Sequence, residues 1–364
     1  MDIPRTVDDV TPEWLTEVLR KDGAVDGTAV RSFGATQLEG GVAGTVYRLT
    51  LQYTSSEMTA PDSVILKLPA ADKAWRELVN RGGFYERESR FYAELVHDVD
   101  VKTARVYHVD MDLPAGDHVL LLEDLQHLRD GDQILGCNEE DARAALRCLA
   151  TLHSRWWNDR RLASTSWLMR PGEASFYDLS AASYAEGIEP GLERLSDWLP
   201  SGIEEIARRF VPAVPWFFQT AGSSPITLCH GDFRLGNLFF SDGDTGVEVT
   251  AIDWQIVSAQ RGASEVAYFM CWSLDTEDRR RIEPGLLEEY HAGLLAGGVS
   301  DYPYADFIQD YRRGFLRNLF TILRVAGNMP EEAFETETMI ATLRAMSKRM
   351  QTLIDWDCGE LLPD

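Results

Sequence analysis

The sequence predicts an α+β protein in which a β-rich part comes first and a mainly helical part follows. Apolar and polar residues alternate in the run GTVYRLTLQY, and SVILKLP is a second short β-like run. From residue 138 the apolar residues instead recur at helical spacing, with two short β-like runs between residues 226 and 257. At 364 residues, the chain is long enough for two lobes or domains.

The first residues are predicted to form a helix followed by a hairpin. In the segment 11–21, Thr11 is a predicted N-cap and Pro12 suits the first helical turn. A strand-like region continues to Leu38, and the glycine-containing segment 39–44 leads into the next strand. A strand, a glycine turn and a second strand together predict a β-hairpin.

Three further elements complete the β-rich part. The run SVILKLP at 63–69 predicts a strand, FYERESRFYAELV at 84–96 a helix, and HVLLLED at 118–124 a buried strand that ends in a polar turn. The β-rich part therefore ends near residues 123–127.

The helical part begins with a predicted capping box. Asn138 precedes Asp141 by three residues, and apolar residues then keep helical spacing to about residue 157. Later, the runs ITLCH and EVTAIDW predict two strands on either side of a loop. The remaining residues are mostly helical in pattern.

Composition and charge exclude several functional classes. The net charge of −24 opposes binding to nucleic acid or to anionic membranes, which require basic patches, and it either attracts cationic ligands or serves solubility alone. No apolar stretch reaches the roughly 20 residues of a membrane helix. The amino terminus lacks the pattern of a secretory signal, and the five scattered cysteines suit a reducing compartment. We expect a cytoplasmic protein without a disulfide framework or a zinc site.

The strongest chemical signal is the octapeptide HGDFRLGN, followed sixteen residues later by Asp253. Phosphoryl transfer requires a base for the attacking hydroxyl and oxygen ligands for Mg²⁺. Asp232 and Asn237, five residues apart on one loop, can supply a carboxylate for the hydroxyl and a carboxamide oxygen for the metal. Asp253 at a strand end offers a further hard oxygen ligand. The alternative is a β-hairpin whose Asp and Asn residues only form turns.

Lys67 is a charged residue inside an otherwise apolar strand. If it is buried, it requires an anionic partner. Phosphate oxygens together with a helix carboxylate would satisfy it, and the helix at 84–96 offers Glu86 and Glu88. The alternative is an exposed strand lysine. The hairpin glycines could let the backbone approach phosphates or could be ordinary turn residues; they are Gly40, Gly41 and Gly44.

The order of these parts resembles that of protein kinases. The chain resembles the aminoglycoside phosphotransferase and choline kinase superfamily, and HGDFRLGNLFF and IDWQ are most similar to its ecdysteroid-kinase-like branch. The resemblance covers nearly the whole chain and is most specific at 228–255. It implies a protein-kinase-like two-lobed fold. The implied parts are a nucleotide-binding lobe at 1–122, a hinge at 123–127, and a catalytic and acceptor-binding lobe at 128–364.

The same resemblance implies a role for each motif residue. Asp232 would be the catalytic base, and Asn237 and Asp253 would be the metal ligands. Lys67 would hold the α- and β-phosphates and pair with Glu88. The hinge would meet the nucleobase through its backbone, at Glu123, Asp124 and Leu125. The glycines Gly40, Gly41 and Gly44 would lie near the phosphates, and His230 would brace the catalytic loop.

The implied function is a kinase that uses ATP and Mg²⁺ to phosphorylate a hydroxyl of a small metabolite or antibiotic. The acceptor could be an amino sugar, an amino alcohol or a lipophilic alcohol. The alternatives are a nucleotide-binding pseudokinase without turnover and a metal-dependent hydrolase. About seventy residues, called the insertion below, separate the helix that ends near Trp157 from the loop at His230. A protein acceptor is disfavoured, because an insertion of this length could form helices over the loop and close a pocket around a small acceptor. Nothing in the sequence sets the oligomeric state.

Several residues have two interpretations. His153 is expected to be a hydrogen-bonded core histidine rather than a catalyst. Glu265 stands where many relatives have Asp, so its role is open. The insertion's Glu186, Glu189 and Glu193 either hold ammonium groups or form a solvated helix face, and the second is expected. The helical stripe Phe307, Tyr311, Phe315 and Leu319 either lines a pocket or belongs to the core, and the second is expected.

Overall fold

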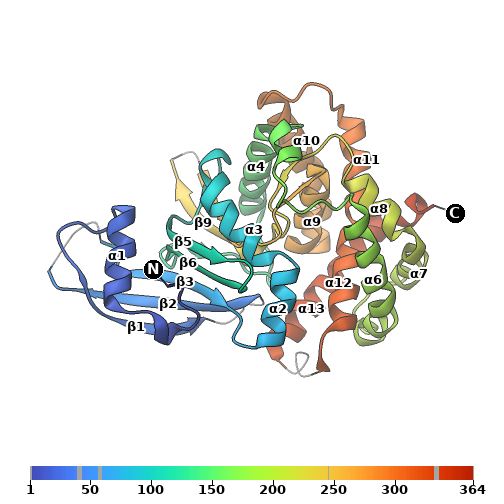
Figure 1. Cartoon of the computed structure of the whole chain (residues 1–364). Coiled ribbons are helices and arrows are strands. Elements are labelled where there is room, and N and C mark those ends of the chain that lie inside the picture. Colours follow the sequence, from blue (N-terminus) through green and yellow to red (C-terminus); the bar gives the residue numbers. More distant parts are fainter. Residues whose placement is uncertain (1, 39–42, 56–59, 245, 332–335, 364) are drawn as a thin grey trace. The chain divides into compact units, whose positions relative to one another are not determined.

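The structure, a computed structural model, describes residues 2–38, 43–55, 60–244, 246–331 and 336–363. It contains two compact units, which are coloured along the chain in Figure 1. The first unit comprises Met1–Leu128 and Thr250–Val257, and the second comprises Arg129–Val249 and Ser258–Asp364. The segment 123–127, predicted to be a hinge, thus falls within the first unit.

The first unit is built on an antiparallel sheet with the strand order β1-β2-β3-β6-β5 (Figure 1). Its strands are β1 (Val30–Leu38), β2 (Gly44–Tyr53), β3 (Ser63–Pro69), β5 (Val106–Asp112) and β6 (Asp117–Glu123). The predicted strands at 44–53 and 63–69 are confirmed, and β6 confirms the predicted buried strand, with all but its last residue buried.

Helix α1 (Pro12–Asp22) covers one face of this sheet. Its start is fixed as predicted, because the Thr11 side chain accepts a hydrogen bond from the backbone N–H of Trp14 at 3.1 Å. Gly23 ends the helix in the left-handed conformation, with φ of 83°. One core joins helix and sheet, and its members include Leu15, Val18, Leu19, Leu66, Leu68, Val119 and Leu121.

The opposite face of the sheet carries Lys67. Side chains alternate along a strand, and Leu66 and Leu68 face α1, so Lys67 points to the other face. There it meets α3 (Phe84–Arg90), which follows α2 (Lys73–Arg81). A short 3-10 helix, Val7–Asp9, precedes α1.

The helix predicted at 84–96 changes type along its length. It is α-helical to Arg90, continues as a π-helix over Phe91–Leu95 and ends in a 3-10 turn over Val96–Asp98. Phe91 and Tyr92 are consecutive and both buried. The wider π turn accompanies this inward placement of two neighbouring aromatic side chains.

Residues 250–257 belong to the first unit, although the sequence predicted them for the second lobe. The end of β10 (Gly246–Ala251) pairs in parallel with β4 (Lys102–Thr103). Beyond it, the ring of Trp254 stacks on that of Phe91, with centroids 4.0 Å apart. The backbone carbonyl of Gln255 accepts a hydrogen bond from Arg87 Nε at 2.8 Å. These contacts fix the segment that carries Asp253.

The second unit is mainly helical, as predicted (Figure 1). Helix α9 (Gly262–Ser273) lies at its centre, with every residue buried, and α4 (Glu139–Arg155) begins at the predicted cap Asn138. The other helices are α5 (Arg160–Ser164), α6 (Ala174–Leu195), α7 (Ile203–Phe210), α8 (Val214–Ala221), α10 (Thr276–Ala296), α11 (Tyr304–Gly314), α12 (Leu316–Asn328), α13 (Glu337–Arg349) and α14 (Gln351–Asp355), with 3-10 turns at Val211–Ala213 and Cys358–Leu361.

Helices α6 and α12 cross at a point that requires glycine. A Cβ atom added to Gly327 would lie 1.8 Å from the carbonyl oxygen of Gly187, and one added to Gly191 would lie 2.5 Å from that of Leu323. The absence of these side chains therefore lets the two backbones touch.

Short strands frame the loop at 230–237. Strand β8 (Thr227–Cys229) leads into the loop and pairs with β11 (Ser258–Gln260), while β9 (Leu238–Gly243) leads out of it and pairs with β7 (Arg129–Asp130). A 3-10 turn over Leu235–Asn237 closes the loop. The loop is thus held at both of its ends.

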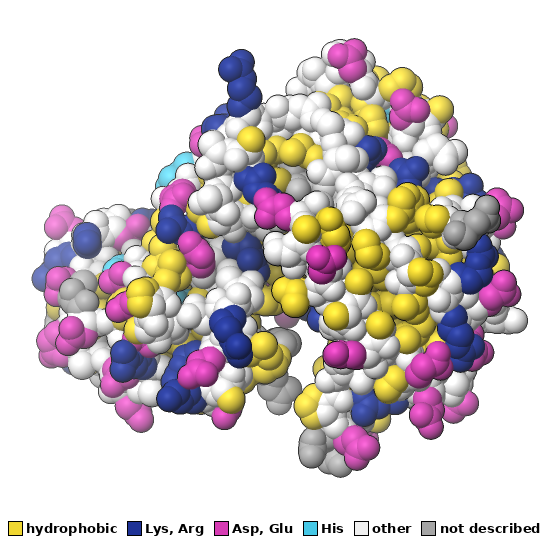
Figure 2. Space-filling view, turned by 45° about the vertical axis from the view of Figure 1, so that its right-hand side comes forward, with side chains coloured by type: hydrophobic (Ala, Val, Ile, Leu, Met, Phe, Trp, Pro, Cys, Tyr) yellow, Lys and Arg dark blue, Asp and Glu magenta, His cyan; other side chains and the backbone are white. Residues whose placement is uncertain are grey.

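The aromatic stripe on α11 and α12 is core, as expected: Phe307, Tyr311, Phe315 and Leu319 are all fully buried. On the face shown in Figure 2, acidic side chains are dispersed and basic ones lie among them, so the negative charge does not form one patch there. None of the described helices combines the length and the hydropathy that a membrane span requires. All five cysteines are free thiols.

Candidate functional site

The loop between β8 and β9 brings Asp232 and Asn237 into direct contact. Asn237 Nδ2 donates to Asp232 Oδ2 at 2.9 Å and to the Asp232 carbonyl at 2.9 Å. Because the amide nitrogen is occupied in this way, the amide oxygen is the atom of Asn237 that can ligate a metal. Arg234 Nε also donates to Asp232 Oδ2, at 3.1 Å.

Residues of helices α9 and α12 form hydrogen bonds with this loop. The hydroxyl of Tyr268 donates to Asp232 Oδ1 at 2.7 Å. Arg317 donates to the backbone carbonyl of Gly231, and its guanidinium lies 4.4 Å from the centroid of the Tyr268 ring. Burial alone would raise the pKa of Asp232, but Arg234 and Tyr268 hold it below its ordinary value. Asp232 therefore stays ionised at neutral pH.

Glu265 anchors the backbone of the same loop. Its two carboxylate oxygens accept hydrogen bonds from the backbone N–H groups of His230 at 3.0 Å and Gly231 at 2.6 Å. Glu265 is fully buried, and burial would raise its pKa, but the hydrogen bond from His153 and the charges nearby lower it. The position left open by the sequence thus supports the loop. The ring of His230 also braces the loop, since its Nδ1 accepts from the N–H of Asp232 at 3.1 Å.

His153 is the expected core histidine. It is fully buried, with Nε2 3.1 Å from Glu265 Oε2 and Nδ1 2.8 Å from the hydroxyl of Tyr290. Cys229 lies beside it, with Sγ 3.7 Å from His153 Nε2. These three side chains have the composition of a metal site, but direct hydrogen bonds already link His153 to Glu265, and both Glu265 oxygens hold backbone groups. The cluster is a hydrogen-bond network that supports the loop.

Three charged side chains meet in the first unit. Lys67 Nζ lies 2.6 Å from Glu88 Oε1 and 3.1 Å from Asp253 Oδ1. Glu88 is buried, whereas the side chain of Asp253 is 30% exposed. Burial alone would lower the pKa of Lys67, but the charges of Asp253 and Glu88 raise it above its ordinary value. Lys67 is thus neither an exposed strand lysine nor an unpaired one.

Two local features accompany this triad. Asp253 has a φ of 69°, which is a strained backbone conformation for a residue other than glycine. His118 is buried on β6, and burial together with the charge of Lys67 lowers its pKa to about 3, so it stays neutral. Its ring stacks on that of Tyr85, with centroids 4.1 Å apart.

The segment predicted to meet the nucleobase is held by its own contacts. Asp124 is buried and accepts hydrogen bonds from Arg48 Nε at 2.6 Å and from the Ser63 hydroxyl at 2.7 Å. The Glu123 N–H donates to a backbone carbonyl, and its carboxylate accepts from a backbone N–H. The Leu125 carbonyl accepts a turn hydrogen bond. The side chains of Glu123 and Asp124 are structural, and a backbone role toward a nucleobase stays a prediction.

The predicted phosphate-loop glycines are described only in part. Gly40 and Gly41 lie outside the described residues. Gly44 begins β2, and a Cβ atom added there would lie 2.3 Å from the carbonyl oxygen of Leu68 on β3. Close packing of two strands is therefore enough to explain glycine at this position, and its role toward phosphate stays a prediction.

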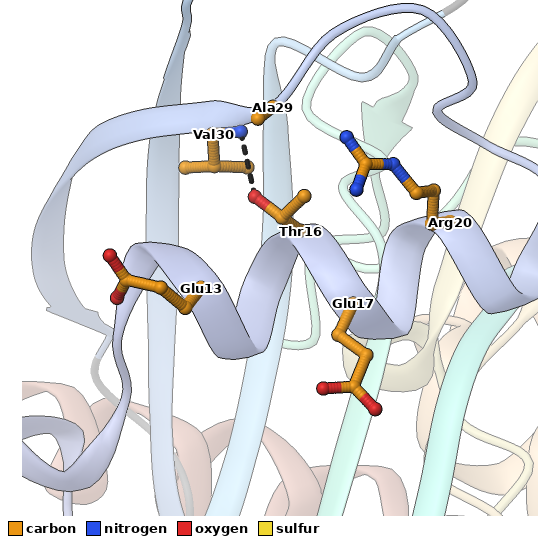
Figure 3. Close-up of a pocket in the computed structure, with 6 residues that line it drawn as sticks. All are labelled: Glu13, Thr16, Glu17, Arg20, Ala29 and Val30. Carbon is orange, nitrogen blue, oxygen red and sulfur yellow. Dashed lines mark hydrogen bonds between the residues drawn. The ribbon is translucent and has the colours of Figure 1, made fainter.

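A shallow groove of about 440 Å³ lies beside α1 in the first unit (Figure 3). Thr16 lines this groove, and its hydroxyl accepts a hydrogen bond from the backbone N–H of Val30 at 2.9 Å. The charged residues Glu13, Glu17 and Arg20 line it as well. Because α1 covers the face of the sheet opposite Lys67, this groove is separate from the triad.

The acidic residues of the insertion form a solvated face, as expected. Glu186, Glu189 and Glu193 of α6 are all exposed, and Glu189 pairs with Arg208 of α7 at 3.0 Å.

Comparison with known proteins identifies the family. Residues 40–157 and 170–297, more than half of the chain, match the model of the ecdysteroid kinase-like family. No curated protein sequence matches the chain.

Solved structures of kinases share the fold over almost the whole chain. A spectinomycin phosphotransferase has a TM-score of 0.56 at 11% identity, covering 96% of this chain and 99% of the other. An amicoumacin kinase has 0.55 at 13%, covering 95% and 96%. Choline kinase from Cryptosporidium parvum has 0.53 at 10%, covering 96% and 98%. The α+β, protein-kinase-like fold is therefore confirmed, and the chain belongs to the ecdysteroid kinase-like family of small-molecule kinases.

Proposed function

We propose that this protein transfers the γ-phosphoryl group of MgATP to a hydroxyl of a small molecule, with Asp232 as the base. The carrying observation is the contact between Asp232 and Asn237, which leaves a carboxylate for a hydroxyl and an amide oxygen for a metal on one short loop. The family assignment supports the reaction class, and the contacts support the individual roles.

The triad in the first unit fits the phosphate end of the nucleotide. One lysine and two carboxylates carry a net charge of −1, and the partly exposed Asp253 offers the hard oxygen that Mg²⁺ prefers. Bound Mg²⁺ would supply charge neutralisation on the phosphates. Lys67, positioned by Glu88, would hold the α- and β-phosphates, and the backbone at 123–125 would face the nucleobase.

At the acceptor, Asp232 takes the proton from the attacking hydroxyl as the oxygen–phosphorus bond forms. The bond to the bridging oxygen of ADP breaks, and ADP leaves with that electron pair. The protein acts by positioning and electrostatics, without a covalent intermediate. Asp232 later releases its proton to water.

The acceptor is a small molecule with a hydroxyl group, and three classes compete: amino sugars, amino alcohols and lipophilic alcohols. The structures with the same fold are named for choline, amicoumacin and spectinomycin, which places candidates from these classes in a first panel. We propose a cytoplasmic location, which is supported by the five free cysteines. Retention of Lys67, Asp232, Asn237 and Asp253 favours turnover over a pseudokinase role.

The first experiment is thermal unfolding of the wild type and Asp253→Ala, each without ligand, with MgATP, and with ATP plus EDTA. A ligand that binds the native state stabilises it by about 2.7 kcal/mol at 100 times its Kd. We expect MgATP to raise the wild-type midpoint and the variant to lose most of this shift. Asp8→Ala, an exposed aspartate of the first unit, is the control and should keep the shift.

A second arm tests turnover by measuring ADP release from MgATP with water alone and with the alcohol panel. Release that depends on one alcohol, together with a phosphorylated product, supports the kinase. A nucleotide-dependent shift without any ADP release would favour the pseudokinase. The absence of a shift with both MgATP and MgGTP would contradict the proposal.

A further inference from the structure

The two oxygens of the Asp232 carboxylate are not equivalent. Oδ2 accepts two hydrogen bonds, from Asn237 Nδ2 at 2.9 Å and from Arg234 Nε at 3.1 Å. Among the residues that the structure describes, Oδ1 accepts one, from the hydroxyl of Tyr268 at 2.7 Å. The side chain is 21% exposed, so a further group can reach it.

The number of lone pairs decides which oxygen serves as the base. Each oxygen of a carboxylate has two lone pairs available to hydrogen-bond donors. Both sites on Oδ2 are occupied, whereas Oδ1 has one left. The proton of an acceptor hydroxyl is therefore directed to Oδ1 of Asp232, the oxygen that also holds Tyr268.

Tyr268 itself has little freedom. Its side chain is buried on the fully buried helix α9, with the guanidinium of Arg317 on its ring and the ring of Trp272 stacked 4.9 Å away. Arg317 also holds the carbonyl of Gly231, the residue immediately before Asp232. Arg317 thus contacts both the tyrosine ring and the backbone of the loop. These contacts keep the Tyr268 hydroxyl within hydrogen-bonding distance of Oδ1.

We infer that Tyr268 is a positioning residue for phosphoryl transfer: it orients Asp232 so that the free lone pair of Oδ1 faces the acceptor hydroxyl. This inference rests on the proposed function. During the reaction the acceptor proton moves to Oδ1, the acceptor oxygen bonds to phosphorus, and ADP leaves with the electron pair of the broken bond. Tyr268 keeps its own proton throughout.

Tyr268→Phe removes the hydroxyl and keeps the ring on which Arg317 lies. Because the lost hydrogen bond is made to a charged group, we expect kcat to fall by about 10- to 140-fold, which corresponds to about 1.5–3 kcal/mol. The KM for MgATP should stay within about twofold, because the hydroxyl acts on the base and not on the nucleotide. The assay is ADP release with water as the acceptor and with any alcohol found active.

The matched control is Tyr184→Phe. Tyr184 is a buried tyrosine of the same unit whose hydroxyl donates to the carbonyl of Ala207 at 3.3 Å. Its variant should keep kcat within about twofold, which separates a role at the base from a general loss of buried hydroxyls. Thermal unfolding of both variants checks that they are folded.

A double-mutant cycle with Asp232→Asn separates positioning from mere structural support. If Tyr268 acts through the carboxylate, Tyr268→Phe lowers kcat in the wild type and has little further effect in Asp232→Asn. Equal losses in both backgrounds, or unchanged kcat in the single variant, would overturn the inference while leaving the kinase intact. A wild type that releases no ADP with water or any alcohol overturns the proposed function, and this inference with it.

Discussion

The carboxylates of the Lys67 triad and the carboxylate of Asp232 have different surroundings. In the first unit, Lys67 is shared between Glu88 and Asp253, so one positive charge faces two negative ones. In the second unit, the single carboxylate of Asp232 is surrounded by donors: an amide, a guanidinium and a phenol. The first arrangement has an excess of negative charge. In the second, hydrogen bonds from three donors fix the orientation of one carboxylate.

This difference shows what each group is suited to do. A net negative charge beside a partly exposed carboxylate can accept a divalent cation, whose charge then offsets that of phosphates. A carboxylate held by several donors is fixed in direction, which favours proton transfer along one line. Mutations that remove a charge should therefore act differently in the two units.

The largest effect is expected for Lys67→Met. The change leaves Glu88 buried without its cation and takes away the charge that would hold the phosphates. We expect ADP release to fall about 10³-fold, as for loss of a charge clamp, and the free energy of unfolding to fall by about 3 kcal/mol. Steady-state kinetics and denaturant unfolding measure the two effects.

The control for this variant is Lys73→Met, which removes an exposed lysine of the same unit whose side chain is 82% exposed. It should keep both activity and stability. Lys67→Met with normal ADP release would show that the triad serves the fold and not the nucleotide.

The next effect, on stability rather than directly on phosphoryl transfer, is expected for Glu265→Gln. In the wild type, the Glu265 carboxylate accepts hydrogen bonds from two backbone N–H groups and contacts His153. The carboxamide of Gln keeps one acceptor oxygen, but it has no negative charge, and its nitrogen cannot accept. We expect a loss of about 3 kcal/mol at pH 7. Burial notwithstanding, the native pKa of Glu265 lies below its ordinary value of 4.5.

The pH dependence of this loss follows from that direction. The contribution of Glu265 is complete above its unfolded pKa and is lost as the pH falls through the lower native value. The difference between wild type and variant should therefore shrink below pH 4.5. Urea unfolding across this range measures it, and a difference that grows toward acid would refute the assignment.

The smallest effect is expected for the combined change of Glu186, Glu189 and Glu193 to Gln. These side chains are exposed, and their charges are screened by solvent. We expect the KM of any active alcohol to stay within about twofold and the unfolding free energy to change by less than about 0.5 kcal/mol. A tenfold rise in KM for an ammonium-bearing alcohol would instead place an acceptor subsite on α6.

Much of the fold could be predicted from local patterns. Alternation predicted β2, a short apolar run predicted β3, and caps at Thr11 and Asn138 predicted the starts of α1 and α4. One octapeptide predicted that Asp232 and Asn237 share a loop. The pairing of Lys67 with Glu88 followed from family resemblance together with the cost of burying a charge.

The remaining site residues could not be predicted, because their contacts join distant segments. Tyr268 lies 36 residues from Asp232, and Arg317 lies 86 residues from Gly231. Both residues lie in helices, and nothing in the local sequence distinguishes a residue that contacts the loop from one that only packs in the core. The type of helix at 91–95 and the grouping of Asp253 with the first unit also depend on tertiary packing, through Phe91 and Trp254.

The placement of residues 250–257 has a practical consequence for dissecting this protein into parts. A fragment that ends at Leu128 lacks Asp253, loses the parallel pairing at β4, and leaves the ring of Phe91 without Trp254. Expression of the first unit alone therefore needs these eight residues grafted back, and a simple truncation is expected to yield an aggregation-prone product. Because the first unit consists of two separate stretches of sequence, no single division point in the gene separates the two units.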